Sequence, residues 1–159
     1  MSRRVADIEY EQMLLSRYTT AQHRLEGDLE RSAYLLLSRL EHQGPMTIAQ
    51  LRDAFLLDTS TVQRQTAAAM REGLLERIPD PDGGQAKKFE ITARGTERLT
   101  KVRQRFVATL DRALEAWSDA DVAHFADLLR RFNLDIERYG ESRGGTTTSW
   151  PRTAAPLAD

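Results

Sequence analysis

The chain has 159 residues, 40% of them hydrophobic and 30% charged, and its formal net charge is −1. This length fits one compact domain with extended ends, and the composition is ordinary for a soluble protein. The near-neutral charge gives no general attraction to nucleic acid, and the absence of cysteine excludes disulfides, thiolate catalysis and cysteine-based metal binding.

The N-terminal stretch MSRRVADIEYEQ is polar and lacks the apolar segment of a signal peptide. No run approaches the roughly 20 apolar residues that a membrane-spanning helix needs. We therefore expect a cytoplasmic protein with no membrane partner.

The first 45 residues predict two helices. The first, residues 7 to 25, has as candidates for its buried side Leu14, Tyr18 and Leu25. The second, about residues 29 to 42, carries apolar side chains at the helical spacing of three and four, namely Ala33, Leu36, Leu37 and Leu40. Gly44 and Pro45 then end it.

Two shorter helices with a tight turn between them follow. Thr47 and Gln50 form a capping-box pattern at the start of a helix whose apolar face holds Ile48, Leu51 and Phe55. Asp58 or Thr59 can cap the next helix, which ends at Gly73. This helix keeps polar residues outside near its N-terminal end, namely Thr59, Ser60, Thr61, Gln63, Arg64 and Gln65.

The remainder predicts a hairpin, two helices and a tail. The strands LLERI and KKFEIT flank the turn-forming sequence PDPDGGQA. Thr92 caps a helix over about 93 to 117, with an apolar stripe of Leu99, Val102, Phe106, Leu110, Ala113 and Trp117, and Ser118 begins another with Val122, Phe125, Leu129, Phe132 and Ile136. We expect a disordered tail over residues 140–159, in which Trp150 is an incidental exposed aromatic or a small docking residue.

This order of elements predicts a mainly α fold with a small β-hairpin wing, which is a winged helix-turn-helix. Such a fold places the N-terminal part of its second helix in the major groove of double-stranded DNA, where hydroxyl, amide and guanidinium groups can contact base edges. The polar face at residues 59–65 is therefore interpreted as a DNA-reading face. Acidic and basic side chains balance over 58–94, whereas 94–105 is basic, and Lys87 and Lys88 are candidate phosphate contacts on the wing.

The last two apolar stripes are long for so small a helix-turn-helix core, so we expect them to form a homodimer with the N-terminal helix. A two-fold dimer would place two reading helices about 34 Å apart, matching a palindrome. The predicted organisation is an N-terminal dimerisation helix (1–28), a DNA-binding lobe (29–98), C-terminal dimerisation helices (99–139) and the tail (140–159).

The segments LLSRLEHQGPMTIAQL, DTSTVQRQTAAAMREGLLERIPDPD and FEITARGTERL resemble the MarR family of bacterial transcriptional regulators over about residues 10 to 138. The resemblance implies a homodimer that binds palindromic promoter DNA, usually as a repressor, and a small-molecule effector that loosens DNA binding. By position, Ser60, Thr61 and Arg64 match the family's reading-helix residues. After DPD the family commonly has an acidic residue and two arginines, where this chain has Gly83, Gly84 and Gln85.

Several alternatives remain. The polar face could be a plain solvated surface, or the winged helix could be a protein–protein interaction module without DNA binding. Only the resemblance suggests that Tyr18, Tyr34 and His42 line an effector pocket. The histidines, His23, His42 and His124, show no metal-ligand spacing, so we expect no metal or other cofactor, and the few nucleophile and base combinations argue against an enzyme.

Overall fold

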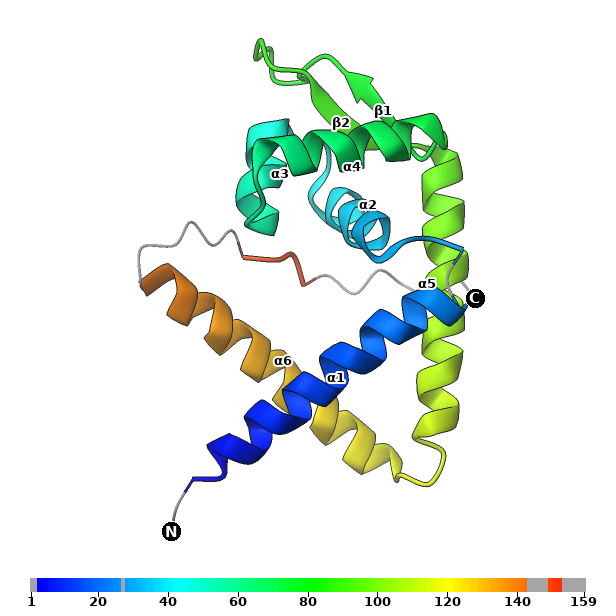
Figure 1. Ribbon diagram of the computed structural model, residues 1–159, viewed down its shortest axis with the longest axis vertical. Coiled ribbons are helices and arrows are strands. Elements are labelled where there is room, and N and C mark those ends of the chain that lie inside the picture. Colours follow the sequence, from blue (N-terminus) through cyan, green and yellow to red (C-terminus); the bar gives the residue numbers. More distant parts are fainter. Residues whose placement is uncertain (1–2, 27, 143–148, 153–159) are drawn as a thin grey trace.

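The computed structural model describes residues 3–26, 28–142 and 149–152, and these form six helices and one two-stranded antiparallel sheet. In chain order the elements are α1 (Val5–Glu26), α2 (Arg31–Gln43), α3 (Ile48–Phe55), α4 (Thr59–Arg71), β1 (Leu75–Ile78), β2 (Lys88–Ile91), α5 (Ala93–Ala113) and α6 (Asp119–Ser142). Figure 1 shows α2, α3, α4 and the hairpin gathered in one lobe, with α5 leading away from it toward α1 and α6. The predicted winged helix-turn-helix is confirmed.

Side-chain caps fix where α3, α4 and α5 begin. Thr47 and Gln50 form the reciprocal capping box: the Gln50 backbone N–H donates to Thr47 Oγ1 at 3.1 Å, and the Gln50 side-chain oxygen accepts from the Thr47 backbone N–H at 2.9 Å. The carboxylate of Asp58 and the hydroxyl of Thr92 accept from the backbone N–H groups of Thr61 and Gly95. The predicted starts of these helices follow directly from such short-range signals.

The turn between α3 and α4 and the end of α4 both use left-handed backbone. Leu56 has φ 54° and closes α3, and Gly73 has φ 75° just beyond α4. The N–H of Leu74 reaches back to the carbonyl of Ala69 at 2.9 Å, which satisfies a carbonyl at the helix end. The predicted stop at Gly73 is therefore where the chain turns into the hairpin.

The hairpin is attached to the rest of the lobe on two sides. β1 pairs with β2 from Leu75 opposite Ile91 to Ile78 opposite Lys88. Beyond this pairing, Met46 exchanges backbone hydrogen bonds with Phe89, so the loop before α3 binds the edge of β2. The wing is thus held to the helix-turn-helix by backbone contacts as well as by the buried Phe89 side chain.

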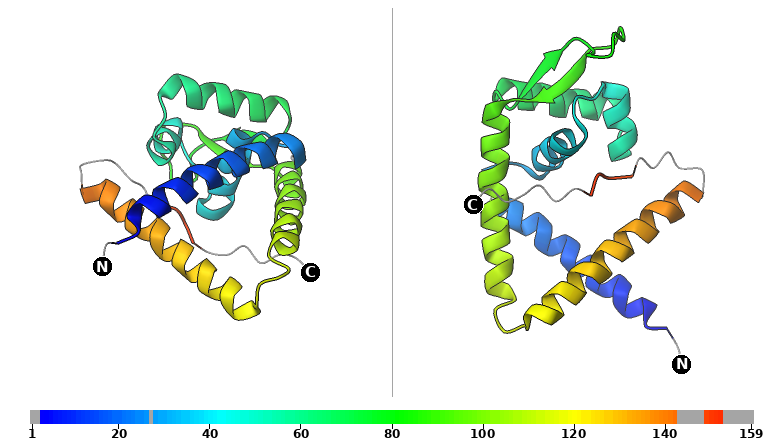
Figure 2. Two further views of the ribbon diagram at one scale, coloured as in Figure 1. Left: turned by 60° about the horizontal axis from the view of Figure 1, so that its bottom comes forward. Right: turned by 180° about the vertical axis from the view of Figure 1, so that it is seen from behind.

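The hydrophobic core lies in the lobe. Its buried apolar side chains run from Leu29 to Phe106 in the sequence, and they include Leu99, Val102 and Phe106 from the first half of α5. The proposed boundary at 98/99 therefore falls inside a helix that contributes to the lobe's core. Figure 2 shows the two halves of α5 from other directions, with the lobe at one end and α6 leaving from the other.

The helices outside the lobe are hardly buried in the single chain. No residue of α6 is buried, and Leu25 of α1 is 82% exposed where the pattern suggested a buried position. Leu14 is half-buried and Tyr18 is 38% exposed. These helices carry the apolar stripes that the sequence predicted, but within one chain few other side chains cover them.

Three expectations for the C-terminal third differ from the structure. α5 ends at Ala113, so Trp117 lies in the following turn, and Ser118 caps α6 by accepting from the N–H of Asp121 at 3.1 Å. α6 continues to Ser142 instead of stopping near 139. Ser149 to Arg152 pack against the molecule, whereas the rest of the predicted tail beyond Ser142 lies outside the described residues. Within the described ranges, no helix is long and apolar enough to cross a membrane.

Candidate nucleic-acid interface

A network of hydrogen bonds organises the start of α4. The Asp58 carboxylate accepts from the Ser60 hydroxyl at 2.6 Å and from the N–H and hydroxyl of Thr61 at 2.7 and 2.8 Å. Arg64 Nη2 then donates to Thr61 Oγ1 at 3.1 Å. One N-cap carboxylate therefore positions three of the side chains that the sequence assigned to DNA reading.

These donors also stabilise the charged form of Asp58. The hydrogen bond from Ser60, the two from Thr61 and the charge of Arg64 hold the pKa of Asp58 well below its ordinary value of 3.8. The carboxylate is thus ionised at neutral pH and keeps both hydroxyl groups donating toward it. The sequence indicated Asp58 only as one of two caps, because its contacts with Ser60 and Arg64 depend on rotamers that spacing does not determine.

α4 is clearly two-sided. Val62, Thr66 and Ala69 are buried against the lobe, and the Thr66 hydroxyl is satisfied by donating to the carbonyl of Val62 at 2.9 Å. On the other side Thr59, Ser60, Gln63 and Arg64 are exposed, while Thr61 and Gln65 are half-buried. The structure therefore leaves four of the six predicted reading residues exposed and two half-buried along the N-terminal part of α4.

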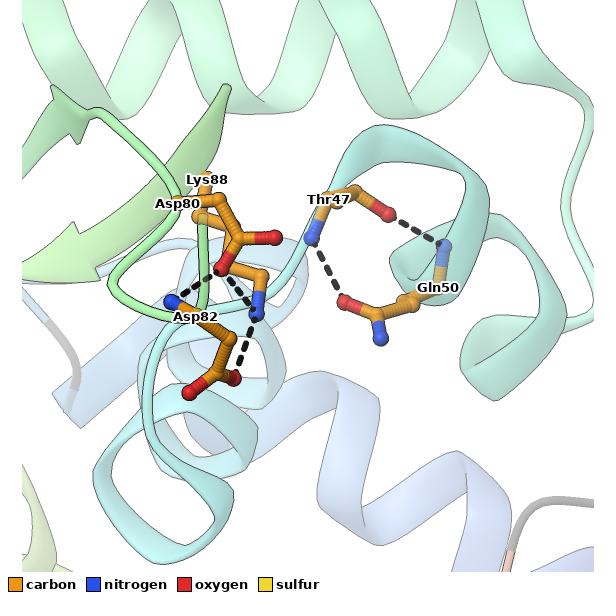
Figure 3. A network of polar contacts seen from close by, with 5 residues as sticks. All are labelled: Thr47, Gln50, Asp80, Asp82 and Lys88. Atoms are coloured by element: carbon orange, nitrogen blue, oxygen red, sulfur yellow. Dashed lines mark hydrogen bonds and ion pairs between the residues drawn. The ribbon is translucent and has the colours of Figure 1, made fainter. Parts of the chain in front are cut away.

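The two lysines of the wing have different surroundings. Lys88 Nζ lies 2.9 Å from Asp80 Oδ1 and 3.6 Å from Asp82 Oδ2. Figure 3 shows Lys88 in contact with both carboxylates. The hydrogen bond and charge of Asp80 raise the pKa of Lys88, and Lys88 in turn lowers the pKa of Asp80. Lys87 is exposed and, among the described residues, forms no ion pair or hydrogen bond. Only Lys87 is therefore free to meet a phosphate without breaking a contact.

The basic run at the start of α5 is largely paired inside the chain. Arg105 lies 3.0 Å from Asp28, and Arg103 lies 2.8 Å from Glu41. Lys101 pairs with Glu97 at 2.8 Å. These contacts attach α5 to the lobe and to its own preceding turn. Because carboxylates neutralise these side chains, the net positive charge around the start of α5 is smaller than the count over residues 94–105 suggests.

A cavity of about 580 Å³ lies between the lobe and α6. Tyr34 and His42 of the predicted effector residues line it, and Tyr18 is not part of its lining. Arg103 also lines this cavity, together with Asn133 and Ile136 of α6, and the sequence assigned none of these three to an effector pocket. The Tyr34 ring packs against the rings of His23 and Phe106, at centroid distances of 5.0 and 5.4 Å.

The described residues contain no cluster of three His, Asp or Glu side chains able to hold a metal ion. What they contain is a winged helix-turn-helix in which α4 has a polar, hydrogen-bonded N-terminal part and the wing is bound to the loop before α3. This combination defines a helix-turn-helix protein of the DNA-binding class.

Comparison with known proteins identifies the family. Residues 27–86 match the model of the MarR family. The uncharacterised HTH-type transcriptional regulator YxaD of Bacillus subtilis strain 168 is 36% identical over 129 residues, which are 79% of this chain and 90% of that protein. The chain therefore belongs to the MarR family of transcriptional regulators, which are not enzymes.

Solved structures agree on the fold. A MarR family protein from Bacillus stearothermophilus superposes with a TM-score of 0.68 at 21% identity, covering 86% of this chain and 99% of that one. The PcaV transcriptional regulator from Streptomyces coelicolor, solved in complex with its natural ligand, gives a TM-score of 0.62 at 19% identity, with 83% and 95% covered. These matches confirm the predicted arrangement of helices and wing.

Proposed function

We propose that this chain acts in the cytoplasm as a homodimeric repressor that binds inverted-repeat promoter DNA through α4. The observation that carries the proposal is the hydrogen-bonded set of Ser60, Thr61 and Arg64, in which Ser60 and Arg64 are exposed and the Asp58 carboxylate supports the hydroxyl groups. Thr59, Gln63 and Gln65 extend this face, and the two glutamines are where we would look for sequence preference. A pre-organised donor and acceptor set loses less side-chain entropy when it meets base edges.

The homodimer is supported by apolar side chains that one chain leaves exposed. They occur on α1, on the second half of α5 and on α6, and include Ile8, Met13, Leu110, Phe125, Leu128 and Ile136. An apolar surface spread over three helices is larger than a soluble monomer ordinarily exposes. A second copy related by a two-fold axis would cover it and would present two reading helices to a palindrome.

The cavity between the lobe and α6 is our candidate effector site. Tyr34 and His42 supply polar groups on its wall, and the cavity has the size of an ordinary small-molecule site. Because it lies between the reading lobe and a proposed dimerisation helix, an occupant could alter the distance between two reading helices. Tyr18, the third predicted effector residue, does not line the cavity in the single chain. In this proposal, Tyr18 would reach an effector site only from a partner chain.

The wing contributes through Lys87 in this proposal. Lys88 is engaged with Asp80 and Asp82, and no arginine occupies the loop from Gly83 to Gln85. The wing is therefore proposed as a phosphate contact of modest strength, and base recognition rests on α4.

The rival function is a winged helix that contacts another protein and not DNA. A titration of labelled random-sequence duplex at several salt concentrations separates the two, because phosphate contacts release counterions. We expect binding at low salt that falls steeply as salt rises, and a loss of about 1–3 kcal/mol on a preferred site for Arg64→Ala. Absence of duplex binding at low salt would favour the protein-contact module.

A further inference from the structure

The segment from Ser149 to Arg152 lies between the lobe and α6, where Figure 1 shows it as a short red stretch. The Trp150 ring meets the Phe55 ring of α3 edge to face, with centroids 5.4 Å apart and planes at 82°. Trp150, Pro151 and Arg152 all line the cavity described above. The segment therefore occupies one side of the space that separates the two halves of the molecule.

Trp150 also meets a buried cation. Arg39 of α2 is 1% exposed, and its guanidinium carbon lies 5.0 Å from the centre of the Trp150 ring. Arg39 Nη1 donates to the carbonyl of Ser149 at 3.2 Å. Burial of a guanidinium costs free energy unless polar or electron-rich neighbours offset it. The segment supplies one hydrogen bond and the Trp150 ring, whereas Arg39 Nε has no hydrogen-bond partner among the described residues.

The other end of the segment binds α6. Arg152 Nη2 forms an ion pair with Glu137 Oε1, and the two side chains are only 24% and 17% exposed. Pro151 between the two anchors fixes its own φ and favours an extended conformation at Trp150. Aromatic and basic side chains thus project to different elements from a short, stiff peptide.

We propose that Ser149–Arg152, which forms part of the wall of this cavity, acts as a latch that ties the reading lobe to α6. Trp150 binds the wall made by Arg39 and Phe55, and Arg152 binds Glu137. This chain's own segment forms the latch, because its aromatic ring, carbonyl and guanidinium each contact a complementary group on the lobe or on α6. The inference goes beyond the proposed function, since it concerns how the two halves are held together and does not require DNA.

Tryptophan fluorescence of the full chain tests the latch. In a Trp117→Phe background, Trp150 is the sole tryptophan, and the replacement keeps a ring beside Phe125. We expect blue-shifted emission that acrylamide quenches slowly. Arg152→Ala and Phe55→Ala should each shift the emission to the red and raise the quenching constant toward that of free N-acetyltryptophanamide.

Arg138→Ala is the matched control, because Arg138 is on α6 and, within the described part of the chain, pairs only with exposed Asp135. It should leave emission and quenching unchanged. Phe55 packs against the hydrophobic core, so its replacement can disturb folding, whereas Arg152 lies outside the core. Arg152→Ala therefore tests the latch independently of the Phe55 variant. Quenching of Trp150 in the parent as fast as in the free amide, or no response to Arg152→Ala, would overturn the latch. Either outcome would leave the duplex titration above unaffected, so the two proposals fail separately.

Discussion

At the scale of single residues, Asp58 has a larger role than its position in the sequence indicates. It caps α4, and it also aligns the hydroxyl groups of Ser60 and Thr61 on the proposed reading face. A cap can be predicted from the residue type and its place before a helix. The contacts beyond the cap depend on side-chain rotamers and could not be predicted.

The lowered pKa of Asp58 predicts acid-sensitive stability. Its folded-state pKa lies below the ordinary 3.8, so its contribution is complete above that value and is lost as the pH falls toward the folded pKa. Asp58→Asn can still accept the cap hydrogen bond but does not titrate. Urea unfolding of both proteins between about pH 2 and 5 should show a weaker pH dependence for the variant. Identical pH dependence would show that Asp58 is not held by these donors.

The close packing around Gly95 predicts that a larger residue there would destabilise the contact between α5 and the hairpin. A Cβ atom there would lie 2.3 Å from the carbonyl oxygen of Leu74 and 2.9 Å from Cγ1 of Ile91. Gly95→Ala should therefore push α5 away from the hairpin and lower the free energy of unfolding by about 1–3 kcal/mol. Thr96→Ala, at the exposed neighbouring position, should change it by less than about 0.5 kcal/mol, and equal effects would contradict this account.

At the scale of elements, local signals predicted the lobe well and the C-terminal part less well. The capping box at Thr47, the stop at Gly73 and the cap at Thr92 all depend on residues within one turn of each other. Trp117 fitted the period of α5 but lies in the turn that follows it. The position of Trp150 depends on Arg39, more than a hundred residues earlier, and no local pattern reports such a contact.

The wing allows a sharp comparison between neighbouring lysines. Lys87→Ala removes an exposed cation and should lower the slope of log affinity against log salt by about one. Lys88→Ala removes the partner of Asp80 and Asp82, so it should loosen the hairpin loop with a smaller change in the salt slope. Affinity for duplex at several salt concentrations measures both. A larger slope change for Lys88→Ala would show that Lys88 leaves its carboxylates to bind phosphate.

At the scale of the whole molecule, the uneven distribution of buried side chains is the main feature. The lobe has a complete core, whereas α6 has no buried residue and α1 exposes several large apolar side chains. The periodicity of these stripes was predicted from the sequence. The surfaces against which these stripes pack could not be predicted, because the sequence pattern of an apolar stripe is the same whether its partner belongs to the same chain or to another.

A charge on the exposed stripe of α6 should break the proposed dimer. Leu128 is 46% exposed, and Leu128→Glu would place a carboxylate in the interface. Light scattering after size-exclusion chromatography should show a monomer for this variant and a dimer for the parent chain. Arg130→Glu, which projects from the other side of the helix, should remain dimeric. A parent chain that is already monomeric would contradict the proposed assembly.

Selection of bound duplexes from a random DNA library, read by sequencing, tests the central claim most directly. If two copies of α4 read DNA together, the selected sequences will contain an inverted repeat with half-site centres about one helical turn apart. Enrichment of a single half-site would contradict the dimeric arrangement. Absence of any enriched sequence at low salt would contradict DNA reading by this face of α4.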